Sequence, residues 1–362
     1  MKAISPVILL FLMSCSSINS KKNFVYSSGY TAIHVTDKSR LYRPDTDTTD
    51  YLHYRPIDID IWYPANSSGT DTLVFVNDLL RLLELRANYY SASNIGNGIA
   101  GQLANYFCNG FKCSDSTRLL NFQTKGLKNA TAASGSFPLV IYLTAFNGMS
   151  YENFTLFESL AKRGFIVASI SSIGRFPGDM TMKNADLLEQ VNDALFVVGH
   201  LKQNQNIDAD NIGIVGYSWG GLAGVIVAGK IPGARCLVSL EGSEFHHYGT
   251  AQEENADFDT IRFSKDFTEL NLAIPYLRLE SSPSTAPEKI DSVYNFTAEH
   301  AENKRIITID SAQHEDFSCF SLVVKESGNC APNHRYLSAL QLTVSFLEDH
   351  LKKQGSLIRE GR

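Results

Sequence analysis

The sequence lacks features that mark several common protein classes. It has, first, no excess of basic residues. Its 362 residues include 32 Lys and Arg against 38 Asp and Glu, which leaves a net charge of −6. Nucleic-acid-binding domains commonly carry a strong basic excess, so this balance argues against binding to DNA or RNA. Beyond the N-terminal segment there is no long apolar run, so no membrane-spanning helix is predicted. Internal repeats and low-complexity tracts are also absent from the sequence.

What the sequence does contain is ample material for a folded core. Hydrophobic residues make up 44% of the chain and charged residues 19%, which excludes global disorder. The length would allow two or three domains. A single large α/β domain with an insertion fits the length equally well.

The N-terminal residues resemble an export signal. The apolar stretch Ala3–Met13 is too short to span a bilayer and has the length of a signal-peptide core. Leu12–Cys15 resembles a bacterial lipoprotein box, in which Cys15 would become the lipidated N-terminus. We therefore predict a signal peptide over residues 1–14, a tether over residues 15–30, and a location in the bacterial cell envelope, anchored at the periplasmic or outer-membrane face. An ordinary secretory signal is the alternative.

Export would make disulfide bonds possible. Cys108 and Cys113 are close in sequence, as are Cys319 and Cys330, so two local disulfide bonds are expected in an oxidising compartment. Four cysteines allow three pairings, and the sequence does not choose among them. Cys236 lies in an apolar run and is predicted to be buried. No two cysteines and two histidines have the spacing of zinc ligands, so no metal site is predicted.

From residue 138 onward, short apolar runs alternate with helical patterns. Apolar strands separated by helices are typical of a parallel sheet covered on both faces. The sequence therefore predicts an α/β fold with a mostly parallel central sheet and helices on both faces. Strands are predicted at 139–143, 165–170, 211–215, 236–240, 275–279 and 305–309, and helices at 153–163, 185–201, 219–229 and 334–352.

The part of the chain before this alternation has a different pattern. Residues 57–63 alternate between apolar and acidic side chains, as in a half-solvated antiparallel strand. Residues 77–130 break the rhythm and include a helix-like, Leu-rich stretch at 79–86. We interpret them as a helical and loop insertion packed on one domain that spans residues 31–352, with a C-terminal tail at 353–362.

The motif with the clearest chemical meaning is Gly-Tyr-Ser-Trp-Gly at Gly216–Gly220. It follows an apolar strand that ends at Val215 and opens a Gly- and Ala-rich helix, which is the strand–turn–helix arrangement of a nucleophile elbow. In such a turn the serine adopts a strained backbone conformation that exposes its hydroxyl, and the flanking positions must be glycine because a side chain would collide across the turn. We predict Ser218 as a nucleophile.

A serine nucleophile needs a base, and the base needs a partner that orients it. His314 lies in the loop after the last predicted strand and is the predicted base. Two acids follow predicted strands and obey the order serine, acid, histidine: Glu241 and Glu280. Their spacing alone does not decide between them.

Several stretches of the sequence together resemble one protein family. It is the platelet-activating-factor acetylhydrolase (group VII phospholipase A2) branch of the α/β-hydrolases, which is related to the dienelactone hydrolases. The resemblance covers roughly residues 55–65 and 137–320, and the segment 77–130 is matched poorly. The stretches are Ile61–Pro64, Phe137–Tyr142, Arg163–Ala168, Gly216–Gly221, Leu237–Gly242 and Gln313–Phe317.

The resemblance implies an α/β-hydrolase fold and assigns roles to further residues. It implies Glu241 as the acid, with Glu in place of the family's usual Asp, and leaves Glu280 as the alternative. It implies the backbone N–H groups of Phe146 and Trp219 as the donors of an oxyanion hole. The family typically has a His-Gly pair where this chain has Thr144–Ala145.

The expected activity is therefore that of a serine carboxylic-ester hydrolase acting through an acyl-enzyme. Short-acyl esters or phospholipids similar to platelet-activating factor are the expected substrates, the latter in lipid degradation. The expected partner is a small-molecule ester, and neither a cofactor nor a metal is needed. Two alternatives stay open. One is a serine peptidase similar to prolyl oligopeptidase, which would favour Glu280 as the acid, and the other is a catalytically inactive binding protein with a hydrolase fold.

Overall fold

The computed structural model describes six stretches of the chain. The predicted signal peptide, the lipoprotein box, most of the predicted tether and the C-terminal tail lie outside them. Strand β1 begins at Ser27, so the end of the predicted tether at 15–30 is wrong, because its last four residues belong to the sheet. No helix in the described residues is long and apolar enough to cross a bilayer. The stretches are 26–90, 98–112, 115–245, 252–281, 301–327 and 332–352.

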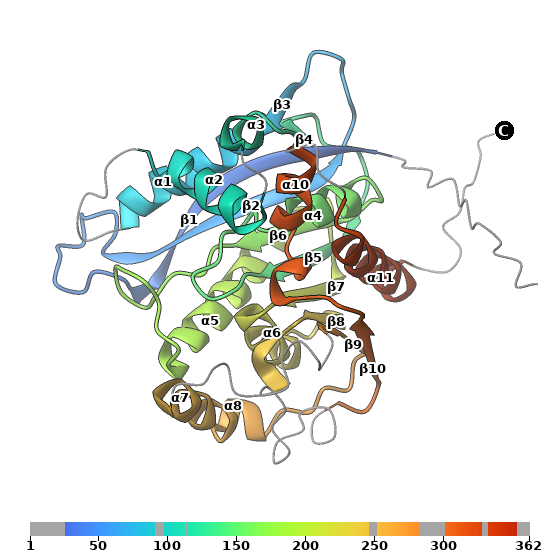
Figure 1. The fold of residues 1–362 in the computed structure, drawn as a ribbon. Coiled ribbons are helices and arrows are strands. Elements are labelled where there is room, and N and C mark those ends of the chain that lie inside the picture. Colours follow the sequence, from blue (N-terminus) through green and yellow to red (C-terminus); the bar gives the residue numbers. More distant parts are fainter. Residues whose placement is uncertain are drawn as a thin grey trace, which may run out of the picture.

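The described strands form one sheet of ten strands in the order β10-β9-β8-β7-β5-β6-β2-β1-β4-β3 (Figure 1). Strands β5 to β10 run parallel to one another, and each corresponds to a predicted apolar strand. The antiparallel strands lie at the other edge, beginning with the pairing of β2 to β6. The bounds are β1 (Ser27–Leu41), β2 (Tyr54–Ala65), β3 (Thr72–Phe75), β4 (Gln123–Lys128), β5 (Phe137–Leu143), β6 (Ile166–Ile170), β7 (Ile207–Tyr217), β8 (Ala234–Leu240), β9 (Tyr276–Ser281) and β10 (Lys304–Ile309).

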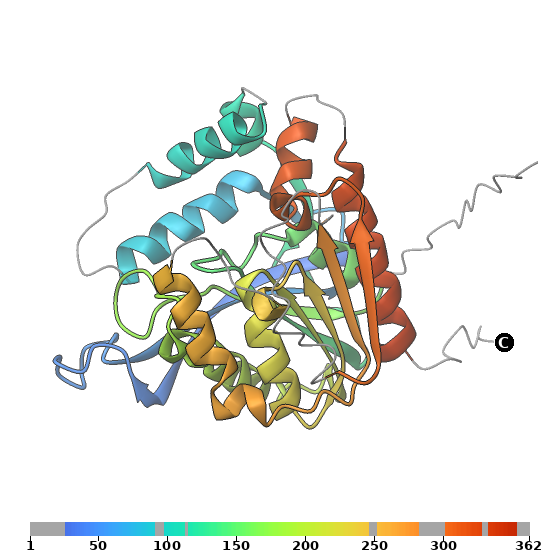
Figure 2. The same cartoon turned by 60° about the horizontal axis from the view of Figure 1, so that its bottom comes forward.

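Helices cover both faces of the sheet and bury a separate hydrophobic core on each. One face carries α5 (Asn184–Leu201), α6 (Trp219–Lys230), α7 (Gln252–Arg262) and α8 (Lys265–Thr268). The other carries α4 (Phe154–Ala161), α10 (Phe320–Ser327) and α11 (His334–Leu351), together with α1 (Val76–Tyr90), α2 (Ile99–Gly110) and α3 (Ser116–Leu120). In Figure 2, α6 (yellow) and α11 (red) lie on opposite sides of the strands. The predicted fold class, a mostly parallel sheet with helices on both faces, is confirmed.

The predicted insertion at 77–130 is not only helices and loops. Its end forms β4, which pairs in parallel with β1 and antiparallel with β3, so it extends the sheet. Its helix α1 brings Arg86 onto β2, where Nη1 donates to the carboxylate of Asp60 at 2.6 Å. The hydroxyl of Tyr30 donates to the same carboxylate at 2.7 Å.

This contact corrects the prediction of a half-solvated strand at 57–63. The strand is antiparallel to both neighbours, as the alternation predicted. Its acidic face, however, is covered by the insertion, and Asp60 is fully buried. A carboxylate can be buried when it is paired and hydrogen-bonded, and Arg86 and Tyr30 supply those bonds. The alternating pattern therefore predicted an antiparallel strand correctly, but its prediction of a solvent-exposed acidic face was wrong.

The cysteine predictions have a mixed outcome. Cys236 is buried in β8 as predicted, and burial raises the pKa of its thiol to about 12. Among the described residues, Cys108 and Cys319 are free thiols buried in one hydrophobic core. Cys108 lies on helix α2, and its side chain is buried among apolar neighbours. Cys113 and Cys330 lie outside the described residues.

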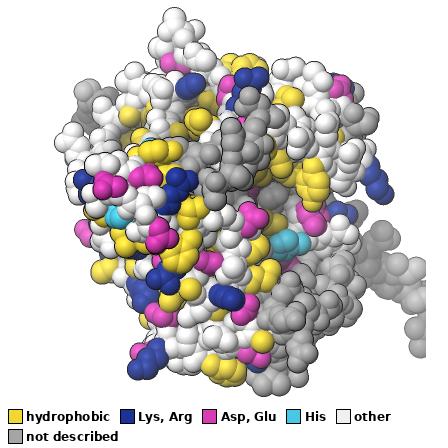
Figure 3. Space-filling model, turned by 90° about the vertical axis from the view of Figure 1, so that its left-hand side faces the viewer, with side chains coloured by type: hydrophobic (Ala, Val, Ile, Leu, Met, Phe, Trp, Pro, Cys, Tyr) yellow, Lys and Arg dark blue, Asp and Glu magenta, His cyan; other side chains and the backbone are white. Residues whose placement is uncertain are grey.

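The described surface mixes charges of both signs. On the face drawn in Figure 3, Lys and Arg side chains are interspersed with Asp and Glu, and hydrophobic side chains lie between them. Neither sign gathers into a large patch among the side chains coloured there, in keeping with the modest net charge of −6.

Candidate active site

Ser218 occupies a sharp turn between β7 and α6. Its backbone angles are φ 55° and ψ −120°, a conformation that non-glycine residues rarely adopt. The turn is held by the backbone of Ser218 itself, whose N–H donates to the carbonyl of Leu240 at 3.0 Å and whose carbonyl accepts from the N–H groups of Gly221 and Ser243. The strand–turn–helix geometry expected of the motif is therefore present, and it exposes the serine hydroxyl at the carboxyl end of the parallel strands.

The two glycines at the ends of the motif, Gly216 and Gly220, have no room for a side chain. A Cβ on Gly216 would lie 2.6 Å from the backbone nitrogen of Gly221 and would overlap the carbonyl of Gly220. A Cβ on Gly220 would lie 2.7 Å from the carbonyl oxygen of Thr144. Backbone atoms cannot yield as side chains can, so the turn requires glycine at both positions.

His314 lies directly beside the serine. Its Nε2 is 3.0 Å from Oγ of Ser218, although the two residues are 96 positions apart in sequence. The imidazole ring stacks on the ring of Tyr217 at a centroid distance of 5.1 Å, and the Tyr217 hydroxyl donates to the carbonyl of His314 at 3.0 Å. Tyr217 therefore fixes both the ring and the backbone of the histidine.

The loop that carries His314 is a short 3-10 helix, His314–Phe317, with its own anchors. The N–H of Gln313 donates to Asp316 at 3.0 Å in a capping box, which closes the first turn. The side-chain amide of Asn333, at the start of α11, donates to the other carboxylate oxygen of Asp316 at 2.6 Å. The loop is thus tied to a long helix.

The two candidate acids have different surroundings. Glu241 follows β8 with φ 47°, is buried, and accepts hydrogen bonds from the backbone N–H and, at 2.6 Å, the hydroxyl of Ser281 at the end of β9. Glu280 is partly exposed and accepts from Nε of Arg278 at 2.8 Å. Burial and the surrounding carboxylates, Glu241 among them, hold the pKa of Tyr217 well above 10. Glu241 directly follows Leu240, the residue whose carbonyl accepts the N–H of Ser218.

The loop after β5 leaves the N–H of Phe146 without a hydrogen bond to the described part of the chain. The N–H of Ala145 donates to Glu152, that of Asn147 to the sulfur of Met180, and that of Gly148 to the carbonyl of Ala145. Among the described residues, the N–H of Phe146 has no hydrogen-bond partner. The ring of Phe146 contacts that of Trp219 edge to face, with centroids 5.8 Å apart. The structure thus brings together the two residues predicted as oxyanion donors.

The departure from the His-Gly pair at Thr144–Ala145 does not leave this loop unsupported. The side-chain amide of Gln190, from α5, donates to the carbonyl of Thr144 at 2.9 Å and to the hydroxyl of Ser172 at 2.7 Å. The hydroxyls of Thr144 and Ser172 are 2.7 Å apart. Sequence reasoning missed these supports, because no local motif links an amide on one helix to a loop 46 residues earlier.

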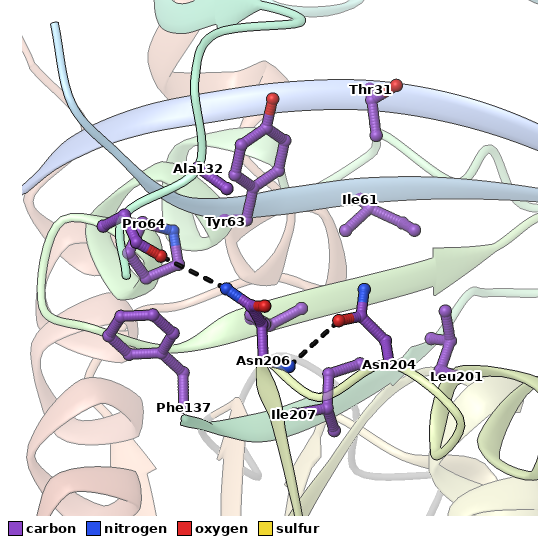
Figure 4. A pocket seen from close by; sticks show the side chains of 12 residues that line it. Thr31, Ile61, Tyr63, Pro64, Ala132, Phe137, Leu201, Asn204, Asn206 and Ile207 are labelled. Carbon is purple, nitrogen blue, oxygen red and sulfur yellow. Dashed lines mark hydrogen bonds between the residues drawn. The ribbon is translucent and has the colours of Figure 1, made fainter. Parts of the chain in front are cut away.

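A separate hollow of about 230 Å³ lies at the opposite end of the parallel strands (Figure 4). Phe137, Ile166 and Ile207, at the starts of β5, β6 and β7, are part of its lining, whereas Ser218 follows the end of β7. In its lining, the backbone N–H of Asn206 donates to Asn204 at 2.9 Å and the side-chain amide of Asn206 donates to the carbonyl of Ala133 at 3.3 Å. The hollow is therefore not part of the site around Ser218.

Comparison with known proteins agrees with the fold. The fold defines the chain as an α/β-hydrolase. Residues 57–256, more than half of the chain, match the X-Pro dipeptidyl-peptidase (S15 family). The chain belongs to this family and is a serine hydrolase. The matched region contains Ser218 and ends before His314. Among curated proteins, none matches the sequence.

Comparison with solved structures gave matches to several hydrolases. A ferulic acid esterase from Streptomyces cinnamoneus is similar with a TM-score of 0.64 and 17% identity, over 93% of this chain and 94% of its own. The dienelactone hydrolase-like promiscuous phosphotriesterase P91 from metagenomic libraries has a TM-score of 0.47 and 10% identity, over 89% and 99%. Est1E from Butyrivibrio proteoclasticus, solved with ferulic acid, has a TM-score of 0.43 and 16% identity, over 60% and 91%. At these identities the likeness to the first is one of fold.

Proposed function

We propose that this serine hydrolase cleaves carboxylic esters through an acyl-enzyme, with Ser218 as nucleophile and His314 as base. The observation that carries the proposal is the 3.0 Å contact between Ser218 Oγ and His314 Nε2 at a strained turn. That distance is within the range needed for a base to take the hydroxyl proton as the oxygen attacks a carbonyl carbon.

The remaining groups of the mechanism follow from the geometry around this pair. Attack by Ser218 places negative charge on the former carbonyl oxygen, and the N–H groups of Phe146 and Trp219 donate to it. His314 then returns the proton to the leaving alcohol, which frees the ester's alcohol and leaves the acyl group on Ser218. A water molecule, deprotonated by His314, attacks the acyl-enzyme and releases the acid. No cofactor enters this sequence.

We assign the acid of the triad to Glu241, with Glu280 as the alternative. Glu241 is buried and directly follows Leu240, whose carbonyl accepts the N–H of Ser218. A buried carboxylate stabilises an imidazolium more strongly than a solvated one. Glu280 is more exposed and is paired with Arg278. Glu241 also accepts a hydrogen bond from Ser281. As the acid of the triad it would therefore accept hydrogen bonds from both Ser281 and His314.

For the substrate, we propose esters with short acyl chains, including phospholipids similar to platelet-activating factor. The basis is the resemblance of the sequence to that branch of the α/β-hydrolases. Ferulic acid esters are a further class to test, because the esterase with the similar fold over nearly the whole chain is named for them.

The test is hydrolysis of p-nitrophenyl esters of increasing acyl length by the purified protein, beside the Ser218→Ala variant. Methyl ferulate and a short-acyl phospholipid extend the series. The expected result is activity that falls steeply beyond short acyl chains and is absent from the variant. Equal rates for protein and variant on every ester would overturn the proposal.

A second candidate, peptide hydrolysis, is favoured by the family match. An X-Pro dipeptidyl peptidase would release p-nitroaniline from Gly-Pro-p-nitroanilide and would fail on the same substrate with a blocked amino group. We expect the ester series to exceed this substrate in kcat/KM. If kcat/KM is instead higher for Gly-Pro-p-nitroanilide than for the esters, and Ser218→Ala cleaves neither, the peptidase proposal would replace the ester proposal.

We also propose that the protein is exported to the bacterial cell envelope and lipid-anchored at Cys15. Its support is the N-terminal sequence alone. Expression in a bacterial host with a clickable palmitate analogue should label the protein, and Cys15→Ser should not be labelled. Equal labelling of both would contradict lipidation at this residue, and release of the unlabelled wild type into the soluble fraction would indicate an ordinary secretory signal.

A further inference from the structure

Glu152 is a buried acid that the mechanism above does not use. It lies just after the oxyanion loop, and its Oε1 accepts the N–H of Ala145 at 3.0 Å and the hydroxyl of Tyr142 at 3.1 Å. Its side chain is almost inaccessible to solvent. Burying a carboxyl group is unfavourable unless its hydrogen bonds are made, so these two donors fix where the group lies.

The next residue, Asn153, faces the other half of the site. Its side-chain amide donates to the carbonyl of Phe317, the last residue of the helical turn that begins with His314, at 2.9 Å. The same amide donates to the hydroxyl of Tyr142 at 3.1 Å. The carbonyl of Glu152 accepts the N–H of Cys319 at 3.0 Å. Neighbouring residues thus hold the oxyanion loop on one side and the histidine loop on the other.

The bond to Ala145 has a consequence for the next N–H group along the chain. The carbonyl of Ala145 accepts the N–H of Gly148 at 2.8 Å. In a planar trans peptide the N–H points away from the preceding carbonyl, so the N–H of Phe146 must point to the opposite side of the loop. With the N–H of Ala145 held by Glu152 and its carbonyl held by Gly148, the direction of the Phe146 donor is set.

The loop is shaped to admit the carboxyl group. A Cβ on Gly148 would lie 2.8 Å from Oε2 of Glu152 and 2.7 Å from the backbone nitrogen of Ala145. Any larger residue at this position would separate Glu152 from the loop. The close approach of backbone to carboxyl group is therefore a built feature of this turn.

We propose that Glu152 is a positioning residue that aligns the Phe146 N–H with Ser218 and His314, by joining the oxyanion loop to the histidine loop through Tyr142 and Asn153. The inference rests on the proposed function, because it gives Phe146 the role of oxyanion donor. It goes beyond that function in assigning a role to a residue that does not touch the substrate.

The ionisation of Glu152 provides a readout that a purely structural role would not affect. Burial, only partly opposed by the bonds from Ala145 and Tyr142, raises its pKa to about 8. The hydroxyl of Tyr142, which donates to Glu152, has a pKa raised well above 10, and burial raises that of Tyr217 likewise. Burial raises the pKa of the thiol of Cys319, whose backbone N–H donates to the Glu152 carbonyl, to about 12. Glu152 is thus the group of this cluster that gains charge near pH 8. A negative charge beside the oxyanion loop opposes the negative charge that forms there, so kcat should fall as Glu152 ionises.

The test compares Glu152→Gln and Glu152→Ala with Glu158→Gln as the matched control. Glu158 is likewise a buried carboxyl with a raised pKa that accepts one backbone N–H, but the donor is Lys125 of β4, at 2.7 Å, and not the oxyanion loop. The Gln variant keeps an acceptor oxygen for Ala145, whereas the Ala variant does not.

We expect Glu152→Ala to lower kcat by about 10- to 100-fold with little change in KM, since loss of an oxyanion donor costs 10²–10³ and misalignment costs part of that. We expect Glu152→Gln to keep most of kcat and to lose the decline near pH 8. Glu158→Gln should have the same kcat as the wild type and the same decline of kcat near pH 8. Wild-type kcat for a folded Glu152→Ala variant would overturn the inference. If that variant does not fold, a decline near pH 8 that persists in Glu152→Gln would overturn it.

The rate of labelling by a fluorophosphonate probe separates this inference from the ester proposal. The probe reports reaction of Ser218 whatever the natural substrate, and its phosphoryl oxygen uses the same donors. Slow labelling of Glu152→Ala beside normal labelling of Glu158→Gln supports the inference even if no ester is cleaved. Equal labelling of both variants, with Ser218→Ala unlabelled, would overturn it while leaving the nucleophile in place.

Discussion

Gly220 in α6 lies directly against the carbonyl group of Leu143 at the end of β5, so closely that a Cβ at Gly220 would overlap it. This contact joins the helix that begins after Ser218 to the strand that leads into the oxyanion loop. Any displacement of the helix would move the nucleophile relative to the Phe146 donor. The glycine thus sets the distance between the two halves of the proposed site.

Gly220→Ala should destabilise the protein by about 3 kcal/mol or more, because backbone atoms on two elements would have to separate. The measurement is urea-induced unfolding followed by circular dichroism. Gly199→Ala is the control: Gly199 lies in α5 with open space around it, and alanine there should stabilise by about 0.5–1 kcal/mol. A Gly220→Ala variant as stable as wild type would show that β5 and α6 can move apart freely.

Ser218→Ala and His314→Ala should each reduce kcat/KM on the best ester by at least 10³-fold, because each removes one member of a unit that works together. The double variant should be hardly worse than either single one. Thermal unfolding should be close to that of the wild type for Ser218→Ala, since its hydroxyl contributes no packing. Additive losses in the double variant would mean that the two side chains do not act on the same step.

Glu241→Gln should lower kcat by more than 10²-fold, whereas Glu280→Gln should stay within about threefold of the wild type. The reason is that glutamine keeps the size of the side chain and one acceptor oxygen, and removes the charge that stabilises the imidazolium of His314. Steady-state kinetics on one short-acyl ester decides between them. Nearly full activity of Glu241→Gln together with a large loss in Glu280→Gln would transfer the acid role to Glu280.

The stability of the protein should depend on pH through Glu158. Burial raises the pKa of its carboxyl group in the folded state to about 7, from an ordinary value of 4.5. Below pH 4.5 both states hold the proton and the group has no effect. Between pH 4.5 and 7 the unfolded chain releases the proton while the folded chain keeps it, so the free energy of unfolding falls as pH rises.

Glu158→Gln removes this titration and should be more stable than the wild type at pH 7, by an amount on the order of 3 kcal/mol at most, and equal to it at pH 4.5. Urea unfolding at pH 4.5, 6 and 7.5 measures the difference. A gap between the two proteins that is constant across this range would show that Glu158 does not keep its proton in the folded state.

The sequence predicts the central part of this fold well because its information is local. Strands β5 to β10 are short apolar runs bounded by helices, and the turn at Ser218 follows from glycines within two residues of it. His314 was found by its place after the last strand, and the structure brings it to 3.0 Å from the serine.

What the sequence did not reveal depends on contacts between distant residues. The burial of Asp60 follows from Arg86 on an inserted helix, and no alternation pattern records that. Glu152 is a single acid between a tyrosine and an asparagine, and nothing nearby distinguishes it from a surface residue. Its bond to Ala145 exists only because the loop folds back over seven residues. The choice between Glu241 and Glu280 fails for the same reason, since both follow predicted strands, although Glu280 lies within β9 in the structure.

The two ends of the described chain leave the domain on the same side (Figure 1). The ring of Tyr26 packs edge to face on Phe137 at the start of β5, and Lys352 lies over Phe165 just before β6. Ser218, in contrast, follows the carboxyl end of β7. A protein attached to a surface through the residues before Tyr26 would hold its nucleophile turned away from that surface. Its reach would then be toward molecules arriving from the surrounding medium, and the length of the tether would set how far from the surface the reaction takes place.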